Sequence, residues 1–282
     1  MLVTGSVGTE LARCCVCGTT GRTLARRPPW AIVQCPVCGL RFTSPRPDAA
    51  ARRQLYDDPR YHGSGGTLRR RGAPPSWLTR IWTDGRLAEL RSAAPAPAAV
   101  LEIGAGSGEF AIAAAALGHR LTAVEPSQPV AARLRAAGIA VVADLADAPP
   151  GPVDVVCCWD TLEHLSDPVT VLRDVRARLG PGGVLLLTVP AADSVPARLL
   201  GGRWWGLKPE QHLWHFTETT VRLVAARAGL VVTRVHRGPA RRAVLVRPDA
   251  LVAVVRPLPD PDPDPAGSGG PHGHTTTMEG TG

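Results

Sequence analysis

The chain has 282 residues, of which 44% are hydrophobic and 20% are charged, which suits one large domain or two smaller ones with a sizeable core. This composition excludes a chain that is disordered throughout, and no window approaches the roughly 18 uninterrupted apolar residues of a membrane-spanning helix. The N-terminus lacks the basic start and apolar run of a signal peptide. We therefore expect a cytoplasmic protein whose seven cysteines form no disulfide framework.

The net charge of +8 is unevenly distributed along the chain. Residues 1–92 carry 15 basic and 6 acidic residues, whereas residues 93–282 carry 17 and 18. A basic N-terminal third suits contact with nucleic acid or an anionic substrate. However, every basic residue except Lys208 is arginine, in a sequence rich in alanine, glycine and proline, which indicates a compositional bias. The charge is therefore a weak guide to the partner.

Residues 10–45 contain two CxxCG repeats, Cys14 to Gly18 and Cys35 to Gly39. Each repeat is typical of a tight turn in which glycine lets the backbone amides point at the sulfurs. The spacing predicts a zinc ribbon in which four thiolates hold one Zn²⁺. A site with four protein ligands leaves no open position, so the zinc is expected to be structural. The predicted ligands are Cys14, Cys17, Cys35 and Cys38, and Cys15 is an alternative to Cys14.

Residues 46–92 form an arginine-rich segment that is interrupted by glycine and proline, and we expect a linker with some helix there. From residue 93 to residue 256, short β-like runs alternate with helical patterns, which predicts βαβ units and a parallel sheet. Residues 257–282 contain almost no apolar side chain, so we expect a disordered tail.

The run from Ala98 to Gly108 predicts a strand, a glycine-rich turn and the start of a helix. Such a turn lets the backbone approach a ligand closely, and the helix N-terminus presents free amides. The loop is GxGxG rather than GxGxxG, because Glu109 stands at the last glycine position. The preceding acid, Glu102, suits an ammonium group better than a pyrophosphate.

Three further strands are predicted to end in acidic residues. The strand 120–124 ends at Glu125, which can accept hydrogen bonds from both hydroxyls of a ribose. The strand 139–143 ends at Asp144, which can accept from an adenine amino group. The strand 153–158 runs into Asp160, at the edge where an open sheet binds its ligand. A fifth strand is expected over 184–189 and a helix over 217–228.

In their order and spacing, these motifs resemble class I S-adenosylmethionine-dependent methyltransferases, over about residues 98–256. The cysteine repeats resemble the N-terminal zinc ribbon of some bacterial methyltransferases, in which a tyrosine pair like Tyr56 and Tyr61 follows. The resemblance implies a Rossmann-like, doubly wound α/β fold, S-adenosylmethionine as cofactor and a small-molecule methyl acceptor. The implied cofactor-binding residues are Glu102, Gly104, Ala105, Gly106, Gly108, Glu125, Pro126, Asp144, Leu145 and Asp160.

The acceptor site has two candidate segments. One is Glu163-His164, directly after the fourth strand, and the other is residues 203–216, where three tryptophans and two histidines suggest the wall or lid of a pocket. His164, His212 and His215 are candidate general bases, since an unperturbed imidazole titrates near pH 6.5. Alternatively, these side chains have a structural role and cap a helix or pack against tryptophan.

Three other functions fit parts of this pattern. An RNA methyltransferase would use the ribbon and the basic linker to hold phosphates, and a zinc-ribbon binding protein would have lost catalysis. An NAD-dependent oxidoreductase is disfavoured by Glu109. We expect a methyltransferase that acts on an oxygen, nitrogen or carbon atom of a small molecule.

Overall fold

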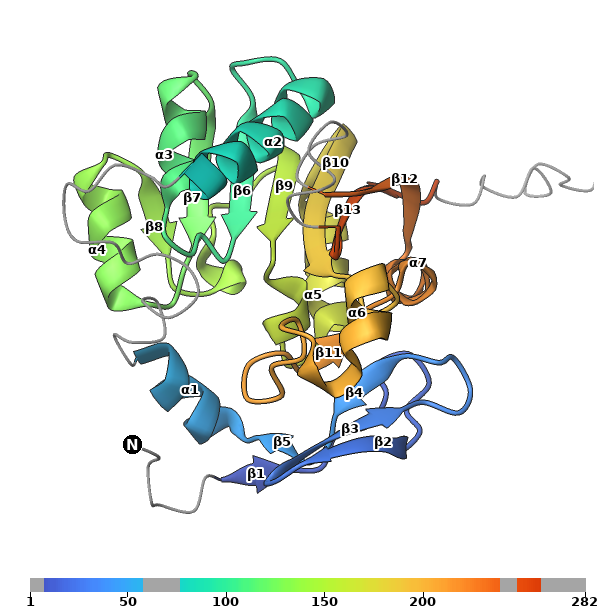
Figure 1. Ribbon diagram of the computed structural model, residues 1–282. Helices are drawn as coiled ribbons and strands as arrows, with labels where there is room; N and C mark the ends of the chain where they lie inside the picture. Colours follow the sequence, from blue (N-terminus) through green and yellow to red (C-terminus); the bar gives the residue numbers. More distant parts are fainter. Residues whose placement is uncertain (1–7, 58–76, 239–247, 260–282) are drawn as a thin grey trace, which may run out of the picture.

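A computed structural model of the chain describes residues 8–57, 77–238 and 248–259 (Figure 1). The central feature is a seven-stranded sheet in the order β12-β13-β10-β9-β6-β7-β8. Its strands are β6 (Ala99–Ile103), β7 (Arg120–Val124), β8 (Ala140–Val142), β9 (Val153–Trp159), β10 (Leu179–Pro190), β12 (Leu230–Arg237) and β13 (Ala250–Pro257). The five strands from β6 to β10 pair in parallel, as predicted, whereas β13 runs antiparallel to both of its neighbours. The sheet is therefore mixed, which corrects the expectation of a parallel sheet.

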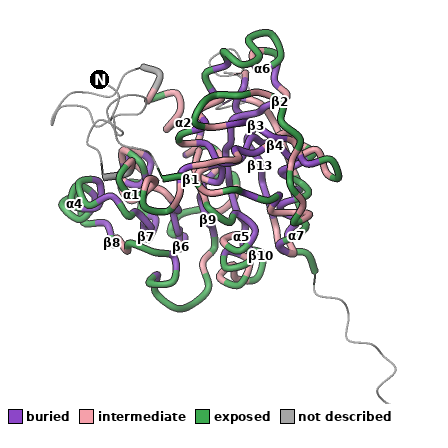
Figure 2. Tube along the Cα trace, turned by 90° about the horizontal axis from the view of Figure 1, so that it is seen from below, coloured by how far each residue is buried: buried purple, intermediate pink, exposed green. Residues whose placement is uncertain are grey.

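Two helical layers cover this sheet because its strands bury both faces. In β9, Val155 and Cys157 point to one face, whereas Val156 and Cys158 point to the other, and all four are buried. The first face packs against α2 (Trp77–Ala93), α3 (Glu109–Ala116) and α4 (Gln128–Ala136). The second face packs against α5 (Pro168–Arg178) and α7 (Glu218–Arg227). Figure 2 shows the buried strands enclosed by more exposed helices.

The N-terminal residues form a small β module. Its antiparallel sheet has the order β11-β4-β3-β2, and β1 pairs with β5 beside it. The elements are β1 (Thr9–Glu10), β2 (Arg22–Arg27), β3 (Trp30–Gln34), β4 (Arg41–Thr43), β5 (Arg46–Pro47), α1 (Ala49–Asp57) and β11 (Trp214–His215). The strand β11 comes from the segment that follows β10, so this segment completes the N-terminal sheet (Figure 1).

The module and the larger sheet share one apolar core. Cys14, Leu40 and Phe42 of the module belong to the same buried cluster as Leu187 and Phe216. Between β10 and β11 lie α6 (Val195–Leu200) and the short helix η3 (Gly201–Arg203). Among the residues that the structure describes, no helix combines the length and apolar character needed to cross a membrane.

Candidate active site

The predicted cofactor-binding residues all lie at the carboxyl ends of β9, β6, β7 and β8, which are neighbours in the sheet. Glu102 lies in β6, and the four residues Gly104, Ala105, Gly106 and Gly108 follow it in the turn to α3. Glu125 and Pro126 follow β7, Asp144 and Leu145 follow β8, and Asp160 follows β9. The sheet thus brings together residues that are up to 58 positions apart in the sequence.

The glycine turn has a backbone that favours glycine at three positions. Gly104, Gly106 and Gly108 have φ values of 75°, 54° and 78°, in the left-handed region. A Cβ on Gly104 would lie 2.4 Å from the hydroxyl of Thr161, whereas a Cβ on Gly106 would meet no atom within 4 Å. The turn therefore packs tightly on one side and leaves space above Gly106, as a cradle for a ligand requires.

Glu125 connects this turn to the end of β7. Its carboxylate accepts hydrogen bonds from the amide of Gly106 at 3.1 Å and from the amide of Ser127 at 2.9 Å, one on each oxygen. Each carboxylate oxygen can accept more than one hydrogen bond, so these contacts orient the group and leave it capacity to accept from a diol. The side chain is buried, which strengthens such contacts.

Glu102 is buried below the turn, with 1% of its surface exposed. Burial raises the pKa of its carboxyl group to about 8, while Arg86 acts to lower that pKa and Glu125 acts to raise it. A cation placed beside Glu102 would favour the ionised form. A role for Glu102 beside an ammonium group stays a prediction.

Arg86 of α2 also reaches this edge of the sheet, although no motif pointed to it. Its guanidinium forms an ion pair with Asp160 at 2.7 Å and lies over the ring of Trp159, 5.6 Å from the centroid. Asp160 itself has φ of 49°, an unusual conformation for a residue other than glycine, of the kind that clusters at functional sites. Arg86 lies in an arginine-rich segment without a motif, so no signal in the sequence distinguishes it.

The two residues predicted to flank the adenine, Asp144 and Leu145, differ in their exposure. Leu145 is buried, whereas Asp144 is exposed and accepts a hydrogen bond from the amide of Ala146, which caps a short helix. A buried apolar side chain next to an exposed carboxylate is an arrangement that can pack against a base and accept from its amino group.

Of the three candidate bases, His212 and His215 are buried and His164 is partly buried. Burial lowers the pKa of His164 to about 4 and that of His215 to about 3, and it holds the pKa of His212 well below its usual range. All three pKa values thus lie below that of an unperturbed imidazole, and a role for these histidines as general bases stays a prediction. His164 and His212 lie together, with ring centroids 4.8 Å apart, whereas His215 is hydrogen-bonded to Thr43 at 3.2 Å.

The segment 203–216 is largely core rather than an exposed lid. Trp204, Leu213, Trp214 and Phe216 are buried, and only Trp205 among its aromatic residues is exposed. The indole of Trp214 donates to the carbonyl of Leu165 at 2.7 Å, which fastens the segment to the short helix η2 (Leu162–His164) and the residue that follows it.

The sulfurs of Cys14, Cys17, Cys35 and Cys38 all lie within 4.8 Å of one another, and those of Cys14 and Cys38 are 3.5 Å apart. Zinc–sulfur bonds of about 2.3 Å in a tetrahedron would place the sulfurs about 3.8 Å apart, so the cluster fits one Zn²⁺. In each repeat the glycine amide donates to the carbonyl of the first cysteine. Cys15 lies outside the cluster and packs against the core instead.

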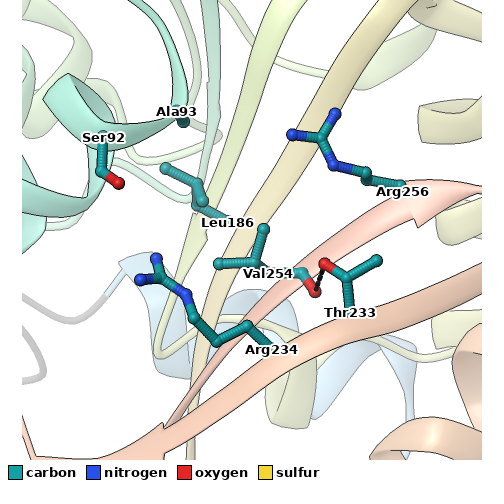
Figure 3. A pocket seen from close by; sticks show the side chains of 7 residues that line it. All are labelled: Ser92, Ala93, Leu186, Thr233, Arg234, Val254 and Arg256. Carbon is teal, nitrogen blue, oxygen red and sulfur yellow. Dashed lines mark hydrogen bonds between the residues drawn. The ribbon is translucent and has the colours of Figure 1, made fainter.

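A cavity of about 240 Å³ lies elsewhere, where α2 ends against β10, β12 and β13 (Figure 3). Arg234 and Arg256 line it, together with Thr233, whose hydroxyl donates to the carbonyl of Val254. None of its lining residues belongs to the predicted site.

Comparisons with known proteins agree with this geometry. Residues 76–235 match the family model described as "Methyltransferase domain". A "Ubiquinone biosynthesis O-methyltransferase" of Xanthomonas campestris pv. campestris (strain B100) is 38% identical over 101 residues, which cover 32% of this chain and 42% of that protein. The match therefore spans less than half of that relative's length.

Two solved structures share the fold. The CcbJ methyltransferase of Streptomyces caelestis has a TM-score of 0.53 and 22% identity, covering 73% of this chain and 98% of its own. The 1,6-didemethyltoxoflavin-N1-methyltransferase of Burkholderia thailandensis, solved with S-adenosylhomocysteine, has a TM-score of 0.54 and 20% identity, covering 84% and 100%. At these identities the likeness concerns the fold alone.

Proposed function

This chain belongs to the methyltransferase-domain family, and from that premise we propose that it transfers a methyl group from S-adenosylmethionine to a small molecule. One observation carries the proposal: Glu125, at the tip of β7, is fastened by its carboxylate to the glycine turn that follows β6. This link holds a ribose-binding acid and an open backbone cradle in one rigid unit.

In this proposal, the described residues would line the cofactor from end to end. Gly106 leaves room for it above the turn, and Glu125 would accept from its ribose hydroxyls. Leu145 and Asp144 would flank the adenine. Glu102 and Asp160 would face the amino-acid end, where Arg86 supplies a positive charge for the carboxylate. The bound cofactor supplies an activated methyl group on a sulfonium sulfur.

The residues of this chain would then act mainly by positioning. In-line displacement needs the acceptor atom held behind the methyl group, with water excluded, and such orientation lowers the barrier without a strong base. The curated relatives are named O-methyltransferases, which supports an oxygen acceptor.

We also propose that the four-cysteine cluster binds a structural Zn²⁺. The short distances between the four sulfurs and the glycine turn of each repeat support this proposal. The family model gives no information on the cluster, because residues 8–57 lie outside the segment that it matches.

The proposal is tested by calorimetry with S-adenosylhomocysteine and NAD. We expect binding of the first and none of the second. In Glu125→Gln the amide cannot accept from both backbone amides and a diol, so affinity should fall about tenfold or more, as loss of a charged hydrogen bond predicts. Glu218→Gln, in an exposed ion pair with Arg222, is the matched control and should bind normally. Binding of NAD alone would refute the proposal.

The acceptor class needs a second measurement. Labelled S-adenosylmethionine should transfer its methyl group to members of a panel of small hydroxylated compounds. Transfer to RNA alone would instead support the nucleic-acid alternative.

A further inference from the structure

Three metal-ligating side chains converge beside the carboxyl end of β9, apart from the cysteine cluster. Glu163 and His164 belong to η2, and His212 precedes β11. One carboxylate oxygen and one nitrogen of each imidazole lie within 4.8 Å of one another, and His164 Nε2 is 3.9 Å from Glu163 Oε1. Glu163 and His212 are buried, and His164 is nearly so.

The hydrogen bonds of the two imidazoles define which nitrogen is available. Nδ1 of His164 lies 3.1 Å from the carbonyl of Gln211, and Nδ1 of His212 lies 2.7 Å from the carbonyl of Gly206. A carbonyl only accepts, so both Nδ1 atoms carry the hydrogen, and the neutral imidazole of this tautomer presents a lone pair at Nε2. A backbone carbonyl that holds one imidazole nitrogen in this way is the usual support of a histidine that binds metal through the other.

The donor set of the cluster suits a metal cation. Two imidazole nitrogens and one oxygen of the Glu163 carboxylate share one small volume, in which Glu163 and His212 are buried. Imidazole and carboxylate groups are common ligands of transition-metal ions.

We propose that Glu163, His164 and His212 bind one divalent transition-metal ion. Two imidazoles and one carboxylate suit ions such as Mn²⁺, Fe²⁺ and Zn²⁺ and leave further coordination positions open. Metal–ligand bonds of about 2.1 Å place neighbouring ligand atoms about 3–3.5 Å apart, so the side chains must draw together by roughly 1 Å.

The cluster adjoins the glycine turn. Thr161, which directly precedes η2, packs against Gly104 of that turn. The proposed metal site is a property beyond the proposed methyl transfer. Metal binding there can be measured without an assay of enzymatic activity.

The test uses the full chain with its cysteine cluster filled by zinc, because Mn²⁺ avoids thiolate ligands. Loss of the free Mn²⁺ signal in electron paramagnetic resonance should show one Mn²⁺ bound per chain. Glu163→Gln, His164→Gln and His212→Gln should each raise the Mn²⁺ Kd about tenfold or more. His119→Gln replaces another buried histidine, in the turn before β7, and should bind as the unchanged protein does.

A measurement on the unchanged protein keeps the test independent of folding in the variants. Electron spin-echo modulation of bound Mn²⁺ should show nitrogen coupling from two imidazoles. Absence of Mn²⁺ binding, binding without nitrogen coupling, or an unchanged Kd in His164→Gln would each overturn the proposal.

Discussion

Thr43 joins the N-terminal β module to the segment before β11, and we predict the effect of replacing it. This fully buried residue ends β4, and its hydroxyl donates to the carbonyl of His212 at 2.9 Å. A hydroxyl has one hydrogen, so at its second contact it must accept, at 3.2 Å, from Nε2 of His215. Thr43→Val keeps the shape of the side chain and removes both hydrogen bonds.

The expected loss follows from the two partners that remain. Each buried group left without a hydrogen bond costs about 1–3 kcal/mol, so the loss of two should lower the free energy of unfolding by roughly 2–6 kcal/mol. Thr43→Ser keeps the hydroxyl and loses one methyl group, which costs about 0.5–1.5 kcal/mol. Relative to the unchanged protein, the valine variant measures the two hydrogen bonds and the serine variant measures the methyl group.

Urea unfolding of both variants measures this difference, and calorimetry with S-adenosylhomocysteine supplies the second readout. The glycine turn has no contact with Thr43 among the interactions of the described residues, so the cofactor Kd should change by no more than about twofold. Equal stability of the valine and serine variants would refute the argument that this junction is held by the hydroxyl. Loss of cofactor binding in a folded Thr43→Val protein would refute the separation of the two sites.

Three further predictions concern the cysteine cluster and the cofactor site. Cys35→Ser should lose the one zinc per chain that metal analysis finds in the unchanged protein and should unfold at lower urea; retention of zinc would contradict the assignment. Gly104→Ala combines a φ of 75° with a Cβ 2.4 Å from Thr161, so cofactor affinity should fall, whereas Gly118→Ala, at φ of 90° in open space, should lose only about 1–3 kcal/mol of stability and bind normally. The raised pKa of Glu102, about 8 against 4.5, means that the folded chain binds more protons than the unfolded chain between those values, so stability should fall as pH rises from 5 to 8. Glu102→Gln should remove a slope of up to about 1.4 kcal/mol per pH unit, and identical urea midpoints against pH in both proteins would contradict this.

Much of the larger sheet could be predicted because its strands carry local signals. The strand from Arg120 to Val124 was predicted with the bounds that the structure has, and a parallel arrangement places the residues that follow such strands at one edge. The antiparallel β13 could not be predicted, because its buried apolar run reads the same in either direction.

The pairing between the N-terminal module and the segment after β10 could not be predicted from the sequence either. Trp214 and His215 form a strand of only two residues. This strand forms by pairing with β4, which lies more than 170 positions earlier in the sequence. Aromatic residues there suggested a pocket wall, whereas Phe42 packs against Trp214 with ring centroids 5.7 Å apart. Arg86 was missed for a related reason, since its role depends on Asp160 across the fold.

The pairing of β11 with β4 has a consequence for where the chain can be cut. The family match begins at residue 76, yet a fragment starting there would leave the backbone edge of Trp214 and His215 bare and uncover the ring of Trp214. An unpaired edge beside an apolar ring invites association with other chains. The segment matched by the family model thus omits strands that complete the sheet around β11, and we expect a monomeric fragment to require a start before Thr9.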